Sequence, residues 1–277
     1  MADAITYLVA NHNQARYVGD CLASLRGQTD DRWRAVVLDD GSTDDSVDVI
    51  ARCLDDRVLL VRHTTNRGYI AALRRLIDEA PTDVVAIVDA DDALTPDATA
   101  RLLDAWAAHP DAALVYSRFA ACDETLTRTH AVHGSALPPG GWSLWHATVG
   151  HVLSFRRTAY RRTAGLDDAM LYAEDRDLVY KLEELAPPVF VDAVLYRYRE
   201  VPGSQSRDPA KRRIGAANAR RARLAALARR GVGGRRRLLW TTAFLADYVA
   251  ATSPRARVRA AATRVLHALG RWLAPDR

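Results

Sequence analysis

The sequence predicts an α/β fold in which a mostly parallel β-sheet carries helices on both faces and is followed by an arginine-rich helical extension. Short apolar runs alternate with amphipathic segments of about ten residues over the first part of the chain. Acidic residues directly follow two of these runs, and the last part of the chain is helical in pattern and rich in arginine. This alternation is typical of parallel strands joined by right-handed helical crossovers.

The pattern of residues 5–116 predicts four β-α units and a fifth strand. Each apolar run ends in a polar turn, and each following segment places its apolar residues on one helical face. The expected strands are residues 5–10, 35–38, 58–61, 84–88 and 113–116, and the expected helices are 17–26, 46–54, 69–79 and 97–108.

The pattern changes after residue 116 and becomes helical after residue 204. The expected strands of this middle part are 119–122, 129–133, 152–155, 189–191 and 194–198, and its expected helices are 156–164 and 174–185. The extension is expected to form helices 216–230, 238–251 and 258–273. We therefore expect one domain over residues 1–204 and a helical extension over residues 205–277.

Composition and charge exclude several protein classes. The 277 residues are 49% hydrophobic, enough for a full core, and the three cysteines are scattered, which favours a reducing compartment. The first residues lack a secretory signal and no apolar run could span a bilayer, so we expect a cytoplasmic protein. Residues 1–204 carry 21 Lys and Arg against 31 Asp and Glu, and residues 205–277 carry 18 against 3. The acidic body argues against a nucleic-acid partner.

Three carboxylates follow a five-residue apolar run that is predicted to be a buried strand. Residues 84–88 run directly into Asp89, Ala90, Asp91 and Asp92. Ligands of open α/β sheets bind at the carboxyl ends of the strands, and an Asp-x-Asp pair there can hold a hard divalent cation. The alternative is a solvated acidic loop.

The strand at 35–38 has the same construction. Asp39 and Asp40 follow it and precede a glycine turn, and then Ser42 or Thr43 with Asp45 forms a helix start. Capping by these residues would leave both Asp39 and Asp40 in the preceding loop. Two strands are thus expected to deliver carboxylates to one edge of the sheet.

These segments together make residues 4–204 resemble a family-2 glycosyltransferase of GT-A fold, an inverting, metal-dependent enzyme with a Rossmann-like sheet that uses nucleotide sugars. The resemblance rests on the order of five motifs, at residues 9–13, 37–44, 66–68, 89–92 and 172–175. It implies a nucleotide-sugar-binding half at 1–116 and an acceptor-binding and catalytic half at 117–204.

The resemblance implies roles for residues on the donor side. Asp91, with Asp89 and Asp92, would hold Mn²⁺ or Mg²⁺, which neutralises charge on the leaving diphosphate. Asp40 would accept a hydrogen bond from the imide NH of uracil or thymine, although a carboxylate also suits a guanine edge. The remaining donor contacts are expected from Ala10, Asn11 and Asn13 around the base, from Ala90, and from Arg67 at the pyrophosphate, where a plain surface charge is the alternative.

On the acceptor side, Asp175 occupies the position of the catalytic base, which takes the proton of the attacking hydroxyl. The alternative is that Glu174 and Asp175 only stabilise a helix N-terminus through its dipole. Glu174, His151 and Trp145 are candidates for contacts to the acceptor, although His151 and the tryptophans, including Trp142, could equally be structural. The acceptor would be a glycan, a lipid-linked sugar or a small natural product with a free hydroxyl.

Two departures from the family pattern limit these expectations. Val201 stands where many members carry a histidine after a Tyr-Arg pair, so a third protein ligand to the metal is in doubt. The Gln-x-x-Arg-Trp motif of processive members is absent, because Gln205 is followed by Ser-Arg-Asp-Pro. We therefore expect transfer of a single sugar.

The last helical segment, residues 258–273, has an apolar face bordered by Arg257, Arg264 and Arg271. Such a helix could dock on the acidic body, lie on an anionic membrane at the inner face, or pair with another subunit as a homo-oligomer.

Two other functions are compatible with an acidic α/β site. A nucleotidyltransferase usually has a glycine-rich loop after its first strand, but residues 10–13 contain no glycine. A non-catalytic nucleotide-sugar binder of the same fold would bind the donor without hydrolysis or transfer.

Overall fold

A single mixed sheet organises the part of the chain that precedes the extension. The computed structural model describes residues 4–144, 149–201 and 208–252, and beyond these 255, 258–259, 261–263 and 265. Over the described residues the sheet has nine strands in the order β3-β2-β1-β4-β8-β6-β9-β5, with β7 paired to β6. The strands are β1 (Ile5–Asn11), β2 (Trp33–Asp40), β3 (Val58–His63), β4 (Val84–Ile87), β5 (Ala93–Leu94), β6 (Leu114–Cys122), β7 (Thr129–His133), β8 (Leu153–Arg156) and β9 (Val189–Arg199).

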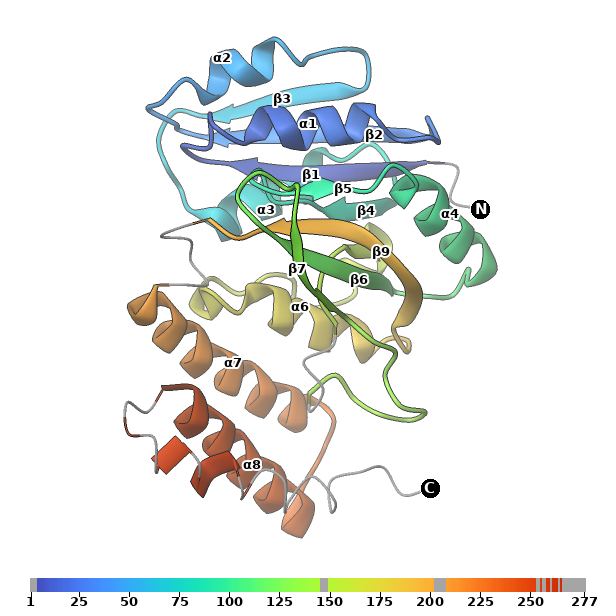
Figure 1. Ribbon diagram of the computed structural model, residues 1–277. Helices are drawn as coiled ribbons and strands as arrows, with labels where there is room; N and C mark the ends of the chain where they lie inside the picture. Colours follow the sequence, from blue (N-terminus) through green and yellow to red (C-terminus); the bar gives the residue numbers. More distant parts are fainter. Residues whose placement is uncertain are drawn as a thin grey trace.

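Helices cover both faces of this sheet, as predicted (Figure 1). One face of β1, β2 and β4 packs against α1, α2 and α4, and the opposite face packs against α3 and α6. Successive strand residues alternate between the two cores; for example, Tyr7 and Val9 lie in one core and Leu8 in the other. The helices are α1 (Val18–Arg26), α2 (Ser46–Ala51), α3 (Tyr69–Glu79), α4 (Ala98–Ala108), α5 (Arg157–Tyr160), the 3₁₀ turn η1 (Asp168–Met170), α6 (Glu174–Glu183), α7 (Pro209–Arg229) and α8 (Gly234–Thr252).

The sheet topology brings the polar segments of the first half to one edge. β1 runs parallel to both β2 and β4, and Asn11 is the register partner of Asp39. Because parallel strands end on the same side, the residues that follow β1, β2 and β4 lie next to one another. β8 is antiparallel to both β4 and β6 and links the two halves into one sheet.

Some element boundaries differ from the sequence predictions. Asp39 and Asp40 are not in a loop but are the last residues of β2. The strand extends this far because it pairs with β3 up to His63. The four short strands expected at 113–116, 119–122, 189–191 and 194–198 form two long ones, β6 and β9, which pair in parallel across bulges. The helix expected at 156–164 is shorter in the structure, where only α5 forms in this range. The short strand β5 was not predicted. These differences arise from strand pairing, which local patterns do not report.

The extension packs on the body through α7. Figure 1 shows α6, α7 and α8 stacked in that order away from the sheet. Ala222, Ala226 and Leu227 of α7 belong to the same apolar core as α3 and α6, and Trp240 of α8 stacks on Trp142 with ring centroids 6.2 Å apart. Trp142 is therefore a packing residue. The predicted segment 258–273 lies largely outside the described residues.

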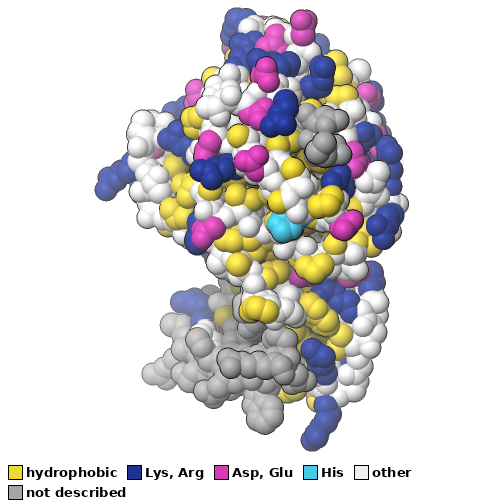
Figure 2. All heavy atoms as spheres, turned by 90° about the vertical axis from the view of Figure 1, so that its right-hand side faces the viewer, with side chains coloured by type: hydrophobic (Ala, Val, Ile, Leu, Met, Phe, Trp, Pro, Cys, Tyr) yellow, Lys and Arg dark blue, Asp and Glu magenta, His cyan; other side chains and the backbone are white. Residues whose placement is uncertain are grey.

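Ion pairs join the arginine-rich extension to acidic residues of the body. Arg229 contacts Glu184 at 2.8 Å, and Arg230 contacts Glu183 at 2.8 Å. On the face seen in Figure 2, basic and acidic side chains are interspersed over the body. Among the described helices, none combines the length and apolar composition needed to cross a bilayer.

Candidate functional site

The loops that follow β1 and β2 are joined by side-chain hydrogen bonds. Asn11 Nδ2 donates to Asp39 Oδ1 at 2.9 Å and to Ser42 Oγ at 3.2 Å. The main-chain N–H of Asn13 donates to Ser42 Oγ at 2.9 Å, and Asn13 Oδ1 accepts from Thr43 N–H at 2.8 Å. Asn11 Oδ1 is buried and has no partner among the described residues. This polar floor adjoins the half-buried Ala10 at the expected base position.

Asp40 makes hydrogen bonds to the chain itself through both of its carboxylate oxygens. Oδ1 accepts from His63 Nδ1 at 2.7 Å and from Arg67 N–H at 2.9 Å, and Oδ2 accepts from Gly68 N–H at 2.8 Å. The carboxylate thereby fixes the turn that opens α3, where Gly68 has φ +87°. These three bonds leave one acceptor position, on Oδ2, for a donor from a base. The Arg67 side chain itself is exposed.

The helix start after Gly41 differs in detail from the expected cap. No side-chain cap bond forms at Asp45, and Ser46 N–H is bound instead by Asp44 Oδ1 at 3.0 Å. Ser42 and Thr43 are used by the β1 loop, as described above. Ser42 and Thr43, which were expected to cap α2, therefore bind the loop after β1 instead.

The three aspartates after β4 have different environments. Asp89 Oδ1 accepts from Tyr69 Oη–H at 3.0 Å and the Asp89 side chain remains half-buried at the surface, as does Asp91. Asp92 is only 1% exposed, and its oxygens accept from Tyr196 Oη–H at 2.7 Å and from Arg199 N–H at 2.6 Å. Asp92, predicted as a metal ligand, thus points into the protein and supports the loop, whereas Asp89 and Asp91 are half-buried on either side of the buried Ala90.

Arg199 binds the loop of residues 89–92, called the acidic loop from here on. Arg199 was not assigned a role from the sequence. Its side chain is 2% exposed, and Nε donates to the carbonyl oxygen of Asp91 at 2.6 Å. A guanidinium nitrogen pairs with Asp20 at 2.9 Å, and the group lies 4.8 Å from the centre of the Tyr17 ring. The only sequence signal was its place in the Tyr-Arg pair that ends the catalytic domain. Tyr69 and Tyr196 gave no signal, because their contacts depend on the tertiary fold.

Burial, and after it charge repulsion, raises the pKa values of Asp91 and Asp92. Burial and the neighbouring Asp89 carboxylate raise the pKa of Asp91 to about 6, against the opposing effect of Arg199. Burial also raises the pKa of Asp92 well above its usual range, with further contributions from Asp89 and Asp91. A cation beside Asp89 and Asp91 would relieve this repulsion.

The second acidic motif lies close enough to the first to interact electrostatically. Burial, then Asp175 and Asp89, raise the pKa of Glu174 to about 7, and burial with Asp89, Glu174 and Asp175 raises the pKa of Tyr69 well above its usual range. Asp175 is exposed in the first turn of α6, where Oδ1 accepts from the N–H of the next residue at 2.7 Å. Asp89 of the first motif and Glu174 and Asp175 of the second therefore lie within electrostatic range of one another.

Glu174 gives the site a measurable pH dependence. Its pKa of about 7 in the folded protein exceeds its reference value of 4.5, so its contribution to stability is complete below about pH 4.5 and is lost as the pH rises through 7. In chelator at pH 8, the unfolding free energy of the Glu174→Gln variant should exceed that of the parent by roughly 1–3 kcal/mol, and its melting temperature should be higher. Near pH 4.5 the two proteins should be equally stable. Thermal melts across this range test it. A difference that does not change with pH would contradict this assignment.

The candidate acceptor residues are only partly described. The half-buried His151 ring stacks on Tyr196 with centroids 4.5 Å apart, and its edge meets Phe119 at 5.4 Å. Since Tyr196 binds Asp92 and the Asp89 main chain, His151 lies beside the acidic loop. Trp145 lies outside the described residues. Within the described part of the chain, no three His, Cys, Asp or Glu side chains form a ready-made metal site.

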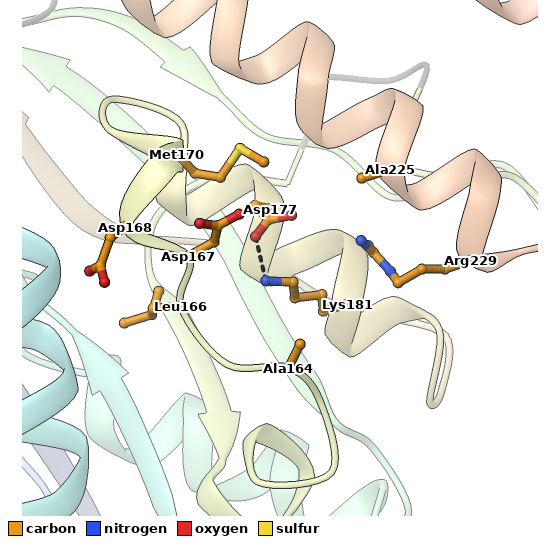
Figure 3. Close-up of a pocket in the computed structure, with 9 residues that line it drawn as sticks. All are labelled: Ala164, Leu166, Asp167, Asp168, Met170, Asp177, Lys181, Ala225 and Arg229. Carbon is orange, nitrogen blue, oxygen red and sulfur yellow. Dashed lines mark ion pairs between the residues drawn. The ribbon is translucent and has the colours of Figure 1, made fainter.

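A separate hollow of about 400 Å³ lies between η1, α6 and α7 (Figure 3). Asp167, Asp177, Lys181 and Arg229 line it, and Lys181 pairs with Asp177 at 2.5 Å. None of the predicted site residues lines this hollow. It belongs to the contact between the body and the extension.

Comparison with known proteins finds a family match and several relatives. The family described as "Glycosyl transferase family 2" matches residues 6–165. The succinoglycan biosynthesis protein ExoU of Rhizobium meliloti is 35% identical over 107 residues, which are 37% of this chain and 31% of that protein. The chain spans less than a third of the length of this and several other curated relatives.

Solved structures share the fold. S. aureus TarS in complex with UDP superimposes with a TM-score of 0.62 at 14% identity, covering 98% of this chain and 90% of that one. The mannosyltransferase PcManGT of Pyrobaculum calidifontis, in complex with GDP-Man and Mn²⁺, gives 0.57 at 22% identity, covering 99% and 87%. The fold is thus of GT-A type, and the family match extends over more than half of the chain. The chain belongs to glycosyl transferase family 2.

Proposed function

We propose that this protein transfers a single sugar from a nucleotide sugar to a hydroxyl-bearing acceptor, with inversion at the anomeric carbon and with the help of a divalent metal. The observation that carries the proposal is that Asp89, which accepts a hydrogen bond from Tyr69, lies within electrostatic range of Glu174 and Asp175. Asp89 and Asp91 suit a cation that binds a diphosphate, and Asp175 beside Glu174 offers a base on the acceptor side.

The residues present fit a divalent metal. Asp89 and Asp91 provide carboxylate oxygens, the ligands that Mn²⁺ and Mg²⁺ prefer, and burial followed by repulsion from Asp89 raises the pKa of Asp91, both of which a bound cation would offset. When bound, the metal neutralises charge that develops on the leaving diphosphate. Because Val201 replaces the expected histidine and Asp92 points inward, we assign the protein ligands to Asp89 and Asp91 alone.

The nucleotide is expected on the polar floor formed by the loops after β1 and β2. Asn11 supports this placement, because its buried Oδ1 has no protein partner among the described residues and could accept from a base. TarS has been seen with UDP and PcManGT with GDP-Man, so both uridine and guanosine donors occur on this fold. We favour a UDP-sugar, with dTDP- and GDP-sugars as alternatives.

The chemistry proposed for Asp175 follows from its exposure beside the acidic loop. The acceptor hydroxyl oxygen attacks the anomeric carbon, the bond to the diphosphate oxygen breaks, and the hydroxyl proton passes to the Asp175 carboxylate. A weak base suffices, because the oxocarbenium-like transition state needs proton removal only late. Attack opposite to the leaving group inverts the anomeric configuration.

The two alternative functions are less well supported. The first loop, where a nucleotidyltransferase would need a flexible glycine-rich cradle for triphosphate, is instead tied down by Asn13, Ser42 and Thr43. A non-catalytic binder would have no use for Glu174 and Asp175 beside the acidic loop. Slow metal-dependent hydrolysis of the donor distinguishes the enzyme from a binder.

A thermal-shift panel tests the donor class. UDP, dTDP, GDP and their sugars are compared with manganese and with chelator. One nucleotide at about 100 times its dissociation constant should stabilise the protein by roughly 2.7 kcal/mol in manganese and by much less in chelator. Absence of a shift with every nucleotide, or equal shifts in chelator, would contradict the proposal.

The contacts of the last helical segment remain predictions. Association with an anionic membrane at the inner face, or with a second copy of the chain, would use residues that are largely outside the described part. The described α7 and α8 are packed on the body, and the proposed reaction requires neither contact.

A further inference from the structure

The segment that precedes Asp175 has an unusual backbone conformation. Tyr172 has φ +65°, a left-handed conformation that bulky residues adopt only when their surroundings impose it. Ala173 then forms the N-terminal cap position of α6 and offers no side-chain cap bond. The position of Asp175 therefore depends on contacts that hold residues 171–173 from outside.

These contacts come from α7. Gly215 lies directly against Tyr172, since a Cβ at that position would be 2.8 Å from the Tyr172 carbonyl oxygen and 3.2 Å from its Cβ. Asn218, one helical turn later, donates from Nδ2 to the carbonyl oxygen of Leu171 at 2.8 Å. Arg221 continues the row and reaches the carbonyl oxygen of Ala169 at 3.3 Å.

The other end of α7 is anchored to the far end of α6. Arg229 pairs with Glu184, and Arg230 contacts Glu183 at 2.8 Å and the carbonyl oxygen of Tyr180 at 3.1 Å. Between the two ends, Ala222 and Ala226 of α7 are buried in the apolar core shared with α6, and the hollow of Figure 3 lies beside them, with Asp177 and Ala225 among its lining residues. The contacts of Gly215 and Asn218 are thus a distinct point of attachment at the Leu171–Tyr172 peptide.

We propose that α7 is a positioning element for the catalytic base, in which Gly215 and Asn218 clamp Leu171 and Tyr172 and so set the place of Asp175 relative to Asp89 and Asp91. This inference rests on the function proposed above. A general base acts only within hydrogen-bond reach of its proton, and a misplacement of about 1 Å can cost roughly 10²-fold in rate. The extension that looks like a basic appendage in the sequence is, on this view, part of the catalytic architecture.

Two variants test the clamp without any knowledge of the donor. Gly215→Ala places a methyl group against the Tyr172 carbonyl, and Asn218→Ala removes the hydrogen bond to Leu171. Amide hydrogen exchange of residues 170–176 should become about tenfold faster in both variants. Gly233→Ala is the matched control, because a Cβ there meets nothing within 4 Å. Unchanged exchange in both test variants would overturn the inference.

The link to the base is tested by a double-mutant cycle on donor hydrolysis, measured with UDP-glucose, dTDP-glucose and GDP-mannose in manganese. Gly215→Ala and Asn218→Ala should each lower kcat by about 10–100-fold with little change in donor affinity. In the Asp175→Asn background the same substitutions should change the residual rate less than twofold. Arg229→Ala, which breaks only the far-end ion pair, should lower the melting temperature and keep kcat.

The outcomes separate this inference from the proposed function. If Asp175→Asn alone keeps the parental rate, the proposed base is wrong, whatever α7 does. If Asp175→Asn is slow but the clamp variants keep the parental kcat, or lose equally in both backgrounds, the positioning role is wrong and the proposed function stands.

Discussion

Replacing Asp175 with asparagine is expected to reduce turnover by roughly 10²–10⁴-fold while donor affinity changes little. Asparagine keeps the size of the side chain but cannot take the proton of the acceptor hydroxyl. Asp175 is exposed and its carboxylate accepts from the N–H of the next residue in α6, so its replacement should leave nucleotide and metal binding intact. Steady-state rates and calorimetric donor titrations on the same preparation measure both quantities.

A purely structural role predicts another result. As a helix-dipole residue in the first turn of α6, Asp175 would contribute only about 0.3–1 kcal/mol to stability, and the folded variant would turn over normally. Asp48→Asn provides the matched control, because Asp48 is also exposed in the first turn of a helix, α2, remote from the acidic loop. Parental turnover in Asp175→Asn would refute its role as the base.

Replacing Asp91 with asparagine is expected to lower transfer by at least about 10²-fold without loss of stability. The pKa of Asp91 is raised to about 6, so near pH 7.5 the folded protein carries an unfavourable buried charge that asparagine removes. Melting temperature in chelator should therefore stay equal or rise. The main-chain bond from Arg199 to the Asp91 carbonyl is retained in the variant.

The exposed Asp104 on α4 offers the matched control for this substitution, since Asp104→Asn changes the same charge away from the site. Activity, melting temperature and manganese-dependent donor binding are compared for the two variants. An Asp91→Asn protein that binds donor and transfers sugar like the Asp104→Asn protein would remove Asp91 from the metal site.

The order of strands and helices in the first half was accessible from the sequence, because each element has a local signature. The pattern of residues 69–79, with five buried apolar residues on one face, predicts α3 with its observed bounds. The sequence did not show that one long strand, β6, forms where two short strands were expected. Pairing with β9 over most of its length keeps β6 extended through residues whose pattern alone indicates a break.

The site shows the same limit at single residues. Sequence placed Asp89, Asp91 and Asp92 in one cluster, but only the fold shows that Tyr196 and Arg199 turn Asp92 inward. Asp39 and Asp40 are adjacent and chemically identical, yet one binds Asn11 and the other binds His63 and the turn before α3. The alternation of a strand sends neighbouring side chains to opposite faces, and the partners they meet come from distant segments.

The role of the extension was likewise hidden by its composition. The sequence left the acidic body, an anionic membrane and a second subunit open as partners of its last helical segment. In the described part, Arg223, Arg229 and Arg230 pair with Asp247, Glu184 and Glu183 within the chain. Gly215 carries no sequence signal that distinguishes it from a weak helix position. Its importance follows only from the approach of Tyr172.

Anomalous diffraction at the manganese edge, from crystals grown with MnCl₂ and the nucleotide that gives the largest thermal shift, tests the central claim most directly. The account predicts an anomalous peak bound by Asp89 or Asp91, with the diphosphate beside it, the base over Asn11, and Asp175 on the opposite side of the sugar position. A nucleotide bound elsewhere on the protein, or bound at this site with no manganese beside either carboxylate, would contradict it.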